Sequence, residues 1–278
     1  MSGLAVMTNA GSLRAMSNLS TTTRALNKTI GRLSSGLRVQ SAADDAAGLA
    51  VTENMRGQMR GYQQAVRNAN DGISILQTAE SAYQSISDTL IRMRELAVEA
   101  ANDSLSDTER GFLDTEFQDL EAEITRISDV TEFNGINLLD GTAGAAGTMT
   151  FQVGTRNSAD DRITVDLEDQ DSTNLGVNAS AVDTRGNAQT AIDEIDVALE
   201  SLNTDRSVLG STISSLTTAV TNLASTVENY GASMGQIRDA DIGAESAAFA
   251  REQVLQQAGV AMLSQANTLP NLALRLLG

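Results

Sequence analysis

Two stretches of the sequence hold residue types that can do chemistry. The first is "GRLSSGLRVQSAADDAAGLA", Gly31 to Ala50, in which glycines and serines precede the acidic pair Asp44 and Asp45. Such a stretch can cradle a phosphate, bind a metal ion or join two helices. A phosphate cradle needs a preceding strand and usually a Gly-Lys pair, which the sequence does not offer here. Acidic residues at a helix start also repel anions, so we interpret this stretch as a connector.

The second stretch is "SADDRITVDLEDQD", Ser158 to Asp171, which gathers carboxylates of the kind that hold calcium. Its spacing does not match the looped calcium motif, which needs a central glycine and a terminal glutamate. We interpret it as the solvated rim of a hairpin. Asp239 and Asp241 form another close acidic pair, but no aromatic or cationic residues accompany them to form a pocket. Capping of a helix start is the role we expect for that pair.

The composition narrows the chemistry further. The chain of 278 residues contains no His and no Cys, which excludes a Ser-His-Asp triad, a thiol nucleophile and the usual zinc ligands. We therefore predict no catalytic residue, no metal site and no cofactor, and we expect a protein that is not an enzyme. A carboxylate-dependent enzyme or a calcium-binding module in the middle of the chain is kept as the alternative from another functional class.

The net charge of the chain limits the classes of partner that it can bind. The formal net charge is -17, and Lys28 is the single lysine. Nucleic acid is a poor partner for such a chain, because phosphate binding depends on clustered cations. An acidic surface favours mutual repulsion, so self-association must be driven by apolar contacts.

The sequence predicts neither a membrane span nor a cleaved secretion signal. No apolar run approaches the length of a span, and "MSGLAVMTNAGSLRAMSNLS" lacks the basic start and the apolar run of a signal peptide. We expect a chain that stays in the cytoplasm or leaves the cell by another route.

Long helices are the elements that position these stretches. Aromatic residues make up 3% of the chain and Pro270 is the single proline, a composition that suits stacked helices better than a compact globule. Apolar residues alternate in steps of three and four. The clearest series is Leu76, Ala79, Tyr83, Ile86, Leu90, Met93, Ala97 and Ala100. The same spacing recurs from Leu113 to Ile127. It recurs again from Ile192 to Ile237, where the stripe has one polar gap near Asp205. Ser106 and Glu109 have the spacing of a capping box, which marks a helix start.

The predicted fold is mainly α: an elongated antiparallel long-helix bundle or coiled coil with a small β-hairpin insert. Residues 141–186 are rich in Gly, Thr, Asp and Asn and contain "TMTFQVG" and "RITVDLE", two alternating runs typical of a hairpin. We expect strands only there. A second break, "GQIRDADIGAES", lies about as far from the carboxy terminus as Gly31–Ala50 lies from the amino terminus, so the two halves can lie antiparallel.

The terminal segments carry apolar stripes that need a partner. Two helices alone leave apolar surface exposed, which indicates burial between copies of the chain. The predicted subunit interface consists of Leu19, Leu26, Ile30, Leu33, Leu37, Leu255, Ala258, Met262, Leu269, Leu272 and Leu276.

Several motifs together carry a family resemblance. They are "NLSTTTRALNKTIGRLSSGLRVQSAADDAAGLAVTENMRGQMRG", "RNANDGISILQTAE", "RMRELAVEAAN", "TEFNGINLLDG" and "VLQQAGVAMLSQANTLPNLALRLL". In this order and at this spacing they closely resemble bacterial flagellin, and the short insert resembles a form with little or no outer domain. The resemblance implies a structural subunit that self-polymerises into the bacterial flagellar filament, in which terminal helices form an inner tube and long helices a second shell.

The resemblance also assigns a role to each segment. It implies an inner-tube helix over residues 1–40, core helices over 41–140, the hairpin and loop insert over 141–186, a core helix over 187–238 and a second inner-tube helix over 239–278. It implies secretion through a type III export apparatus with an export chaperone, an extracellular location, and contact with filament cap and hook-junction proteins. A Toll-like receptor of innate immunity is a further partner implied by Arg92, Leu96 and Glu116, although packing between subunits is the interpretation we favour for those residues.

Two further alternatives remain at this point, besides the carboxylate-dependent enzyme or calcium-binding module. A hook-filament junction protein of the same superfamily shares the terminal helices but does not polymerise alone. An intracellular coiled-coil scaffold also accounts for heptads, although the two breaks and the many Ala, Ser and Gln residues suit helices packed on several sides.

Overall fold

The fold is described from a computed structural model, which covers residues 9–277, with side chains up to residue 268. The chain divides into two compact units. The terminal unit comprises residues 1–57 and 229–278, and the central unit comprises residues 58–228. The boundaries fall inside two long helices, whereas the sequence-based segments were divided at the breaks. Each unit is described below by itself.

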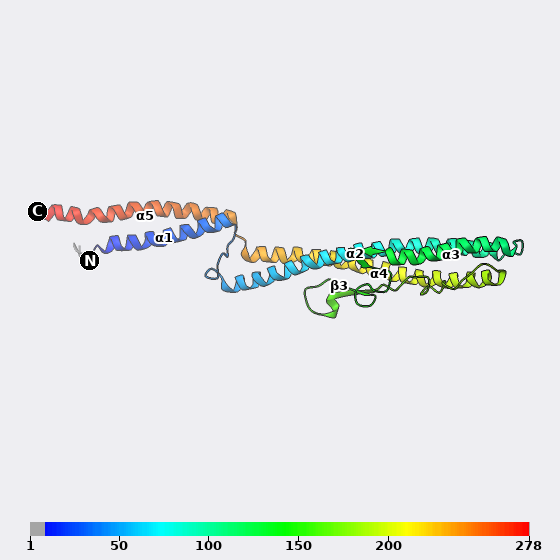
Figure 1. Cartoon of the computed structure of the whole chain (residues 1–278). Coiled ribbons are helices and arrows are strands. Elements are labelled where there is room, and N and C mark those ends of the chain that lie inside the picture. Colours follow the sequence, from blue (N-terminus) through cyan, green and yellow to red (C-terminus); the bar gives the residue numbers. More distant parts are fainter. Residues whose placement is uncertain (1–8, 278) are drawn as a thin grey trace. The chain divides into compact units, whose positions relative to one another are not determined.

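Five long α-helices account for most of the described chain (Figure 1). They are α1 (Ala10–Ser35), α2 (Ala46–Ala100), α3 (Asp107–Val130), α4 (Arg185–Arg238) and α5 (Ile242–Leu277). The strands are short: β1 (Glu132–Phe133), β2 (Ile136–Asn137), β3 (Thr148–Gln152) and β4 (Arg162–Asp166), with a 3-10 helix at Ala159–Asp161. The mainly α fold with small hairpins is confirmed.

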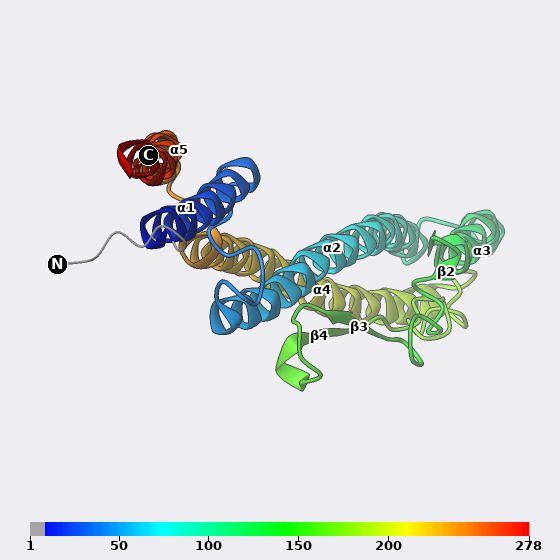
Figure 2. The ribbon, with the colours of Figure 1, turned by 90° about the vertical axis from the view of Figure 1, so that its left-hand side faces the viewer.

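In the terminal unit, α1 and α5 run side by side (Figures 1 and 2). Asn9 caps the start of α1 by accepting a hydrogen bond from the Ser12 N–H at 3.0 Å. Gly36 ends the helix in the left-handed conformation, with φ of 71°, and its N–H donates to the Arg32 carbonyl at 2.8 Å. A residue with a Cβ is strained in that conformation, which explains the glycine at this exit.

In the central unit, α2, α3 and α4 surround one apolar core. The heptad series from Leu76 to Ala100 lies on the buried face of α2, and every member is fully or almost fully buried. Ile195, Leu202, Leu209 and Leu216 supply the facing residues from α4 at steps of seven. Ser106 and Glu109 form the predicted capping box at the start of α3. The period read from the sequence therefore predicted both the helices and their buried faces.

Two antiparallel hairpins complete the central unit. β3 and β4 pair from Thr148 with Asp166 to Gln152 with Arg162, as predicted for the insert. The hairpin lies close to α2, because a Cβ at Gly72 would meet the ring of Phe151 at 2.9 Å. Glycine at position 72 thus makes room for an aromatic side chain in the core.

The expectation that strands occur only within residues 141–186 is wrong. β1 and β2 form a second hairpin at residues 132–137, joined by Asn134 and Gly135, which both have positive φ. Asn-Gly is the residue pair favoured in such two-residue turns. The strands are only two residues each, too short for an alternating pattern to show in the sequence.

Among the described residues, no helix combines the length and the apolar character that crossing a membrane requires.

Candidate functional site

The connector between α1 and α2 is built as a helix exit followed by a helix start. After Gly36, Asp44 accepts hydrogen bonds from the backbone N–H and the hydroxyl of Ser41. Asp45 accepts one from the Gly48 N–H at 2.9 Å, inside the first turn of α2. Lys28 of α1 approaches Asp44 at 2.6 Å, and this hydrogen-bonded ion pair lowers the pKa of Asp44 to about 2. The polar side chains of Ser41, Asp44 and Asp45 thus have structural partners.

The second break, after α4, lies against the first. The Ala240 N–H donates to the Gly36 carbonyl at 2.9 Å, and the Arg38 N–H donates to the Arg238 carbonyl at 2.7 Å. Asp241 accepts hydrogen bonds from the N–H groups of Gly243 and Ala244 and so caps the start of α5. The capping role expected for Asp241 is confirmed, and Asp239 forms a backbone bridge with Leu37.

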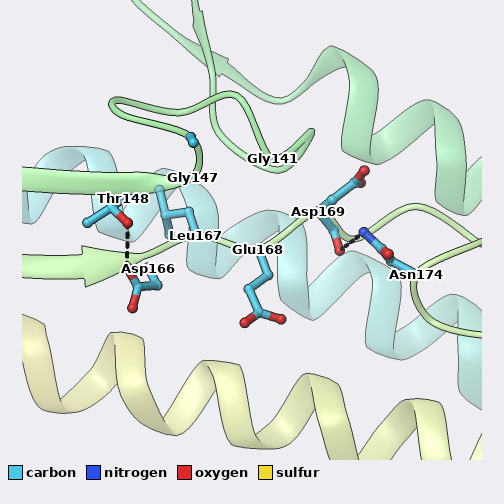
Figure 3. A pocket seen from close by; sticks show the side chains of 9 residues that line it. Gly141, Gly147, Thr148, Asp166, Leu167, Glu168, Asp169 and Asn174 are labelled. Atoms are coloured by element: carbon cyan, nitrogen blue, oxygen red, sulfur yellow. Dashed lines mark hydrogen bonds between the residues drawn. The ribbon is translucent and has the colours of Figure 1, made fainter.

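The carboxylates of the insert line a cavity of about 350 Å³ beside β3 and β4 (Figure 3). Asp166 accepts a hydrogen bond from the Thr148 hydroxyl at 2.7 Å, and Glu168 is directed toward α4 while Asp169 lies beside Asn174. Burial, with nearby acidic groups, raises the pKa of Asp169. The described residues contain no cluster of three or more acidic, His or Cys side chains with the geometry of a metal site. These carboxylates are therefore spread along a hairpin rim.

The face of α5 that packs on α1 mixes small, polar and large apolar side chains. It carries the half-buried Phe249, Gln256 and Leu263, and a Cβ at Gly259 would lie 3.2 Å from the Leu19 side chain. Arg32 of α1 pairs with Glu245 of α5 at 3.0 Å across the same contact. On α1, only Leu26 and Thr29 are buried. The α1–α5 contact therefore buries few of its side chains completely.

Other positions around α5 carry large apolar side chains that face solvent. Val254, Leu255, Val260 and Met262 are 51–65% exposed, and we call these four residues the α5 outer face. On α1, Leu13 and Met16 are exposed to a similar degree. Large apolar side chains that are exposed together on neighbouring helices mark an interaction surface.

The structure divides the predicted interface residues between these two sides. Leu26 is buried, and Leu19, Leu33 and Leu37 are half-buried. Ile30, Leu255, Ala258 and Met262 are exposed, whereas Leu269, Leu272 and Leu276 lie outside the residues whose side chains are described. Leu13, Met16, Val254 and Val260 were not predicted. They lie outside the one apolar heptad series that the prediction used on each terminal helix. A search for further exposed apolar positions on the same helices would have identified them.

The three residues expected at a receptor surface differ in their exposure to solvent. Arg92 of α2 reaches Glu116 of α3 at 2.7 Å and Glu95 at 3.0 Å, and these contacts raise the pKa of its guanidinium. Leu96 is 1% exposed and belongs to the core of the central unit. A partner that binds this surface touches Arg92 and Glu116 but not the side chain of Leu96.

Charge is divided unequally between the two units. Residues 1–57 and 229–278 contain nine Lys and Arg against seven Asp and Glu, a net charge of +2. Residues 58–228 contain ten against 29, a net charge of -19. The unit that exposes apolar helix faces is thus nearly neutral, and electrostatic repulsion opposes contacts between copies of it least.

Comparisons with known proteins match both ends of the chain. The model of the bacterial flagellin N-terminal helical region matches residues 6–144, and that of the C-terminal helical region matches residues 192–277. The flagellin of Halalkalibacterium halodurans is 40% identical over 97% of this chain and 98% of its own length. The flagellin of Bacillus subtilis is 37% identical over the same shares.

Solved structures agree with this assignment. A crystal structure of Bacillus cereus flagellin is similar with a TM-score of 0.50 and 33% identity, over 56% of this chain and 88% of that one. A putative flagellar hook-associated protein from Vibrio parahaemolyticus has a TM-score of 0.57 over 70% of this chain and 100% of its own, but at 15% identity it shows the fold alone. By its two matched regions and its full-length relatives, this chain belongs to the bacterial flagellin family.

Proposed function

We propose that this chain is the structural subunit of a bacterial flagellar filament and that copies polymerise through the outer faces of α1 and α5. Membership of the flagellin family supports the filament role. The α5 outer face carries the finer proposal, because four large apolar side chains there have no cover within their own chain. Burying them against a second copy removes apolar surface from water.

The incomplete burial between α1 and α5 gives a reason for assembly to be coupled to folding. Few side chains are fully buried between the two helices, and most helical stability in proteins comes from packing of an apolar face. In the filament both faces of α5 are covered. We propose that α1 and α5 are loosely held in the single chain and become firmly folded on assembly.

The same proposal places the protein outside the cell. A filament used for swimming is extracellular, so the subunit must be secreted, and we propose passage through a flagellar type III export apparatus. An export chaperone that covers the α5 outer face before export would prevent early assembly. Contacts with the filament cap and hook-junction proteins would use the same terminal helices, and a Toll-like receptor remains a proposed partner of the Arg92 and Glu116 surface.

The experiment is a polymerisation assay of purified protein seeded with short filament fragments. The Val254→Ser and Met262→Ser double variant loses two of the four side chains of the α5 outer face, and we expect it to remain in the supernatant after ultracentrifugation. Gln253→Ser and Gln257→Ser on the same helix serve as the control, because they change exposed polar residues only. We expect the control to sediment as long filaments, like the unchanged chain.

Circular dichroism of each variant separates failed assembly from failed folding. If the apolar variant forms filaments at the same rate and with the same heat stability as the control, the α5 outer face is not the polymerisation surface. If the unchanged chain forms no filaments with seeds, the filament role itself is wrong.

A further inference from the structure

Three places in the chain carry a side chain that can react with its own main chain. In each of them an asparagine or aspartate precedes a glycine: Asp71-Gly72, Asn134-Gly135 and Asp140-Gly141. The glycine matters because it has no Cβ to hinder the approach of the preceding side chain to its backbone nitrogen. The three pairs differ in how strongly the structure restrains them.

Two of the pairs are held in place. Asp71-Gly72 lies inside α2, where backbone N–H groups are used in the helix, and the ring of Phe151 lies against the buried Gly72. Asp140 accepts hydrogen bonds from the N–H and the hydroxyl of Thr142, at 2.9 and 2.6 Å. Burial acts to raise the pKa of Asp140, but the hydrogen bonds outweigh it and lower that pKa. The Asp140 carboxylate is therefore kept charged and fixed.

Asn134-Gly135 is the unrestrained pair and forms the exposed tip of the β1–β2 hairpin. The Asn134 side chain makes no hydrogen bond with any described part of the chain, and a Cβ at Gly135 would meet no atom within 4 Å. Gly135 lies between the paired residues Phe133 and Ile136, so the hairpin ladder does not use its N–H. A hairpin of two residues per strand opens easily. The amide and the neighbouring nitrogen can then meet.

We propose that Asn134 is a site of spontaneous deamidation through a succinimide ring. The Gly135 nitrogen attacks the Asn134 Cγ and forms a Cγ–N bond. The Cγ–Nδ2 bond breaks, and the proton of the Gly135 nitrogen leaves with Nδ2 as ammonia. Water then adds to one of the two ring carbonyls and leaves aspartate or isoaspartate at position 134. The reaction needs only the folded chain and water, so this inference does not rest on the proposed function.

The two products have different consequences for the hairpin. Aspartate, like asparagine, tolerates the positive φ of 54° at Asn134, so the turn is kept and one negative charge is added. Isoaspartate places an extra carbon in the main chain, which disrupts the two-residue turn and the pairing of Phe133 with Ile136. Leu138 and Leu139 follow directly and are fully buried. Isoaspartate should therefore lower the stability of the central unit, whereas aspartate should not.

The test is peptide mapping by mass spectrometry after the soluble chain is incubated at mildly alkaline pH, with a parallel sample in urea. Asn157 is the comparison site, because its side chain accepts a hydrogen bond from the Arg162 guanidinium and it precedes a serine. At each site the rate in the folded chain is divided by the rate in urea, which removes the intrinsic difference between the two asparagines. We expect this ratio to be several times higher for Asn134 than for Asn157.

Variants test the same site in the intact protein. Anion-exchange chromatography of the incubated chain should show a more acidic form that accumulates with time. Asn134→Gly keeps a residue that suits the turn but removes the reacting amide, so most of this acidic form should be lost. Asn157→Gly is the matched control and should leave its accumulation unchanged.

Asn134→Asp separates the two products. It should elute with the acidic form and unfold at the temperature of the unchanged chain, whereas the isoaspartate fraction should unfold at a lower temperature. The inference is overturned if the two ratios are equal, or if Asn134→Gly accumulates the acidic form as fast as the unchanged chain.

Discussion

At the scale of single residues, the polar gap in the apolar stripe of α4 has a structural explanation. Asp205 takes a position in that stripe and accepts a hydrogen bond from the Gln170 amide at 2.9 Å. Burial, with Glu168 nearby, raises the pKa of Asp205 above its ordinary value. Gln170 itself is buried, so the pair fastens the loop after β4 to α4. A carboxylate here costs free energy when it is charged.

Asp205→Asn should therefore stabilise the protein at neutral pH. Because the pKa of Asp205 is raised in the folded chain, its contribution to stability is greatest below the ordinary carboxyl pKa and is lost as pH rises through the raised value. Asparagine keeps the acceptor for Gln170 without the charge. Urea unfolding at pH 4 and pH 7 measures this, and the stability of the variant should change less between the two pH values than that of the unchanged chain.

Asp196→Asn is the matched control, because its carboxylate has the opposite behaviour. The hydrogen-bonded ion pair with Arg94 lowers the pKa of Asp196, so its contribution is present at neutral pH and is lost as pH falls. This exposed pair contributes little because solvent screens it, and we expect only a small loss of stability at pH 7. Equal effects of the two variants would contradict our account of Asp205.

At the scale of elements, the start of α3 depends on its capping box. The Glu109 carboxylate accepts a hydrogen bond from the Ser106 N–H at 2.7 Å, and the Ser106 hydroxyl accepts one from the Glu109 N–H at 3.4 Å. These bonds satisfy backbone donors that have no partner within the helix. The Ser106 backbone bond is also the main cause that lowers the pKa of Glu109.

Ser106→Ala should destabilise the central unit by about 1 kcal/mol, the usual cost of losing a helix cap. Thermal unfolding of the full chain measures the loss. Ser104→Ala changes a serine in the same loop that lies outside the cap, and it should have no measurable effect. Equal unfolding temperatures for the two variants would show that the cap does not hold α3.

The sequence predicted an element well where the element carries a long residue pattern and poorly where the pattern is short. The stripe from Leu76 to Ala100 covers about seven turns of one helix, and such a period leaves one buried face. The capping box is also a local pattern. The β1–β2 hairpin was missed because two residues per strand give no alternation, although Asn134-Gly135 was a readable turn signal.

The terminal helices show the limit of a sequence pattern for the candidate site. Met262 was expected at an interface between subunits, and the structure leaves it exposed, but the interface itself stays a prediction. Leu26 followed the same type of stripe and is buried within its own chain. A heptad tells which residues share a face, but which partner covers that face depends on tertiary packing.

At the scale of the whole molecule, the uneven charge predicts that assembly depends on salt. The central unit carries a net charge of -19, and packing many copies together brings these charges close to one another. Screening reaches about 30 Å at 0.01 M salt and about 10 Å at 0.1 M. Polymerisation on seeds, followed by light scattering, should therefore be faster at the higher salt concentration. Slower growth in salt would mean that ion pairs between subunits drive assembly instead of apolar contacts.

The most direct test of the account is amide hydrogen exchange, measured by mass spectrometry on the soluble chain and on filaments of the same protein. The account predicts fast exchange in α1 and α5 of the soluble chain and strong protection of both in the filament, because assembly covers their outer faces. The core face of α2 should be protected in both states. Equal exchange of α1 and α5 in the two states, or new protection confined to residues 58–228, would contradict polymerisation through the terminal helices.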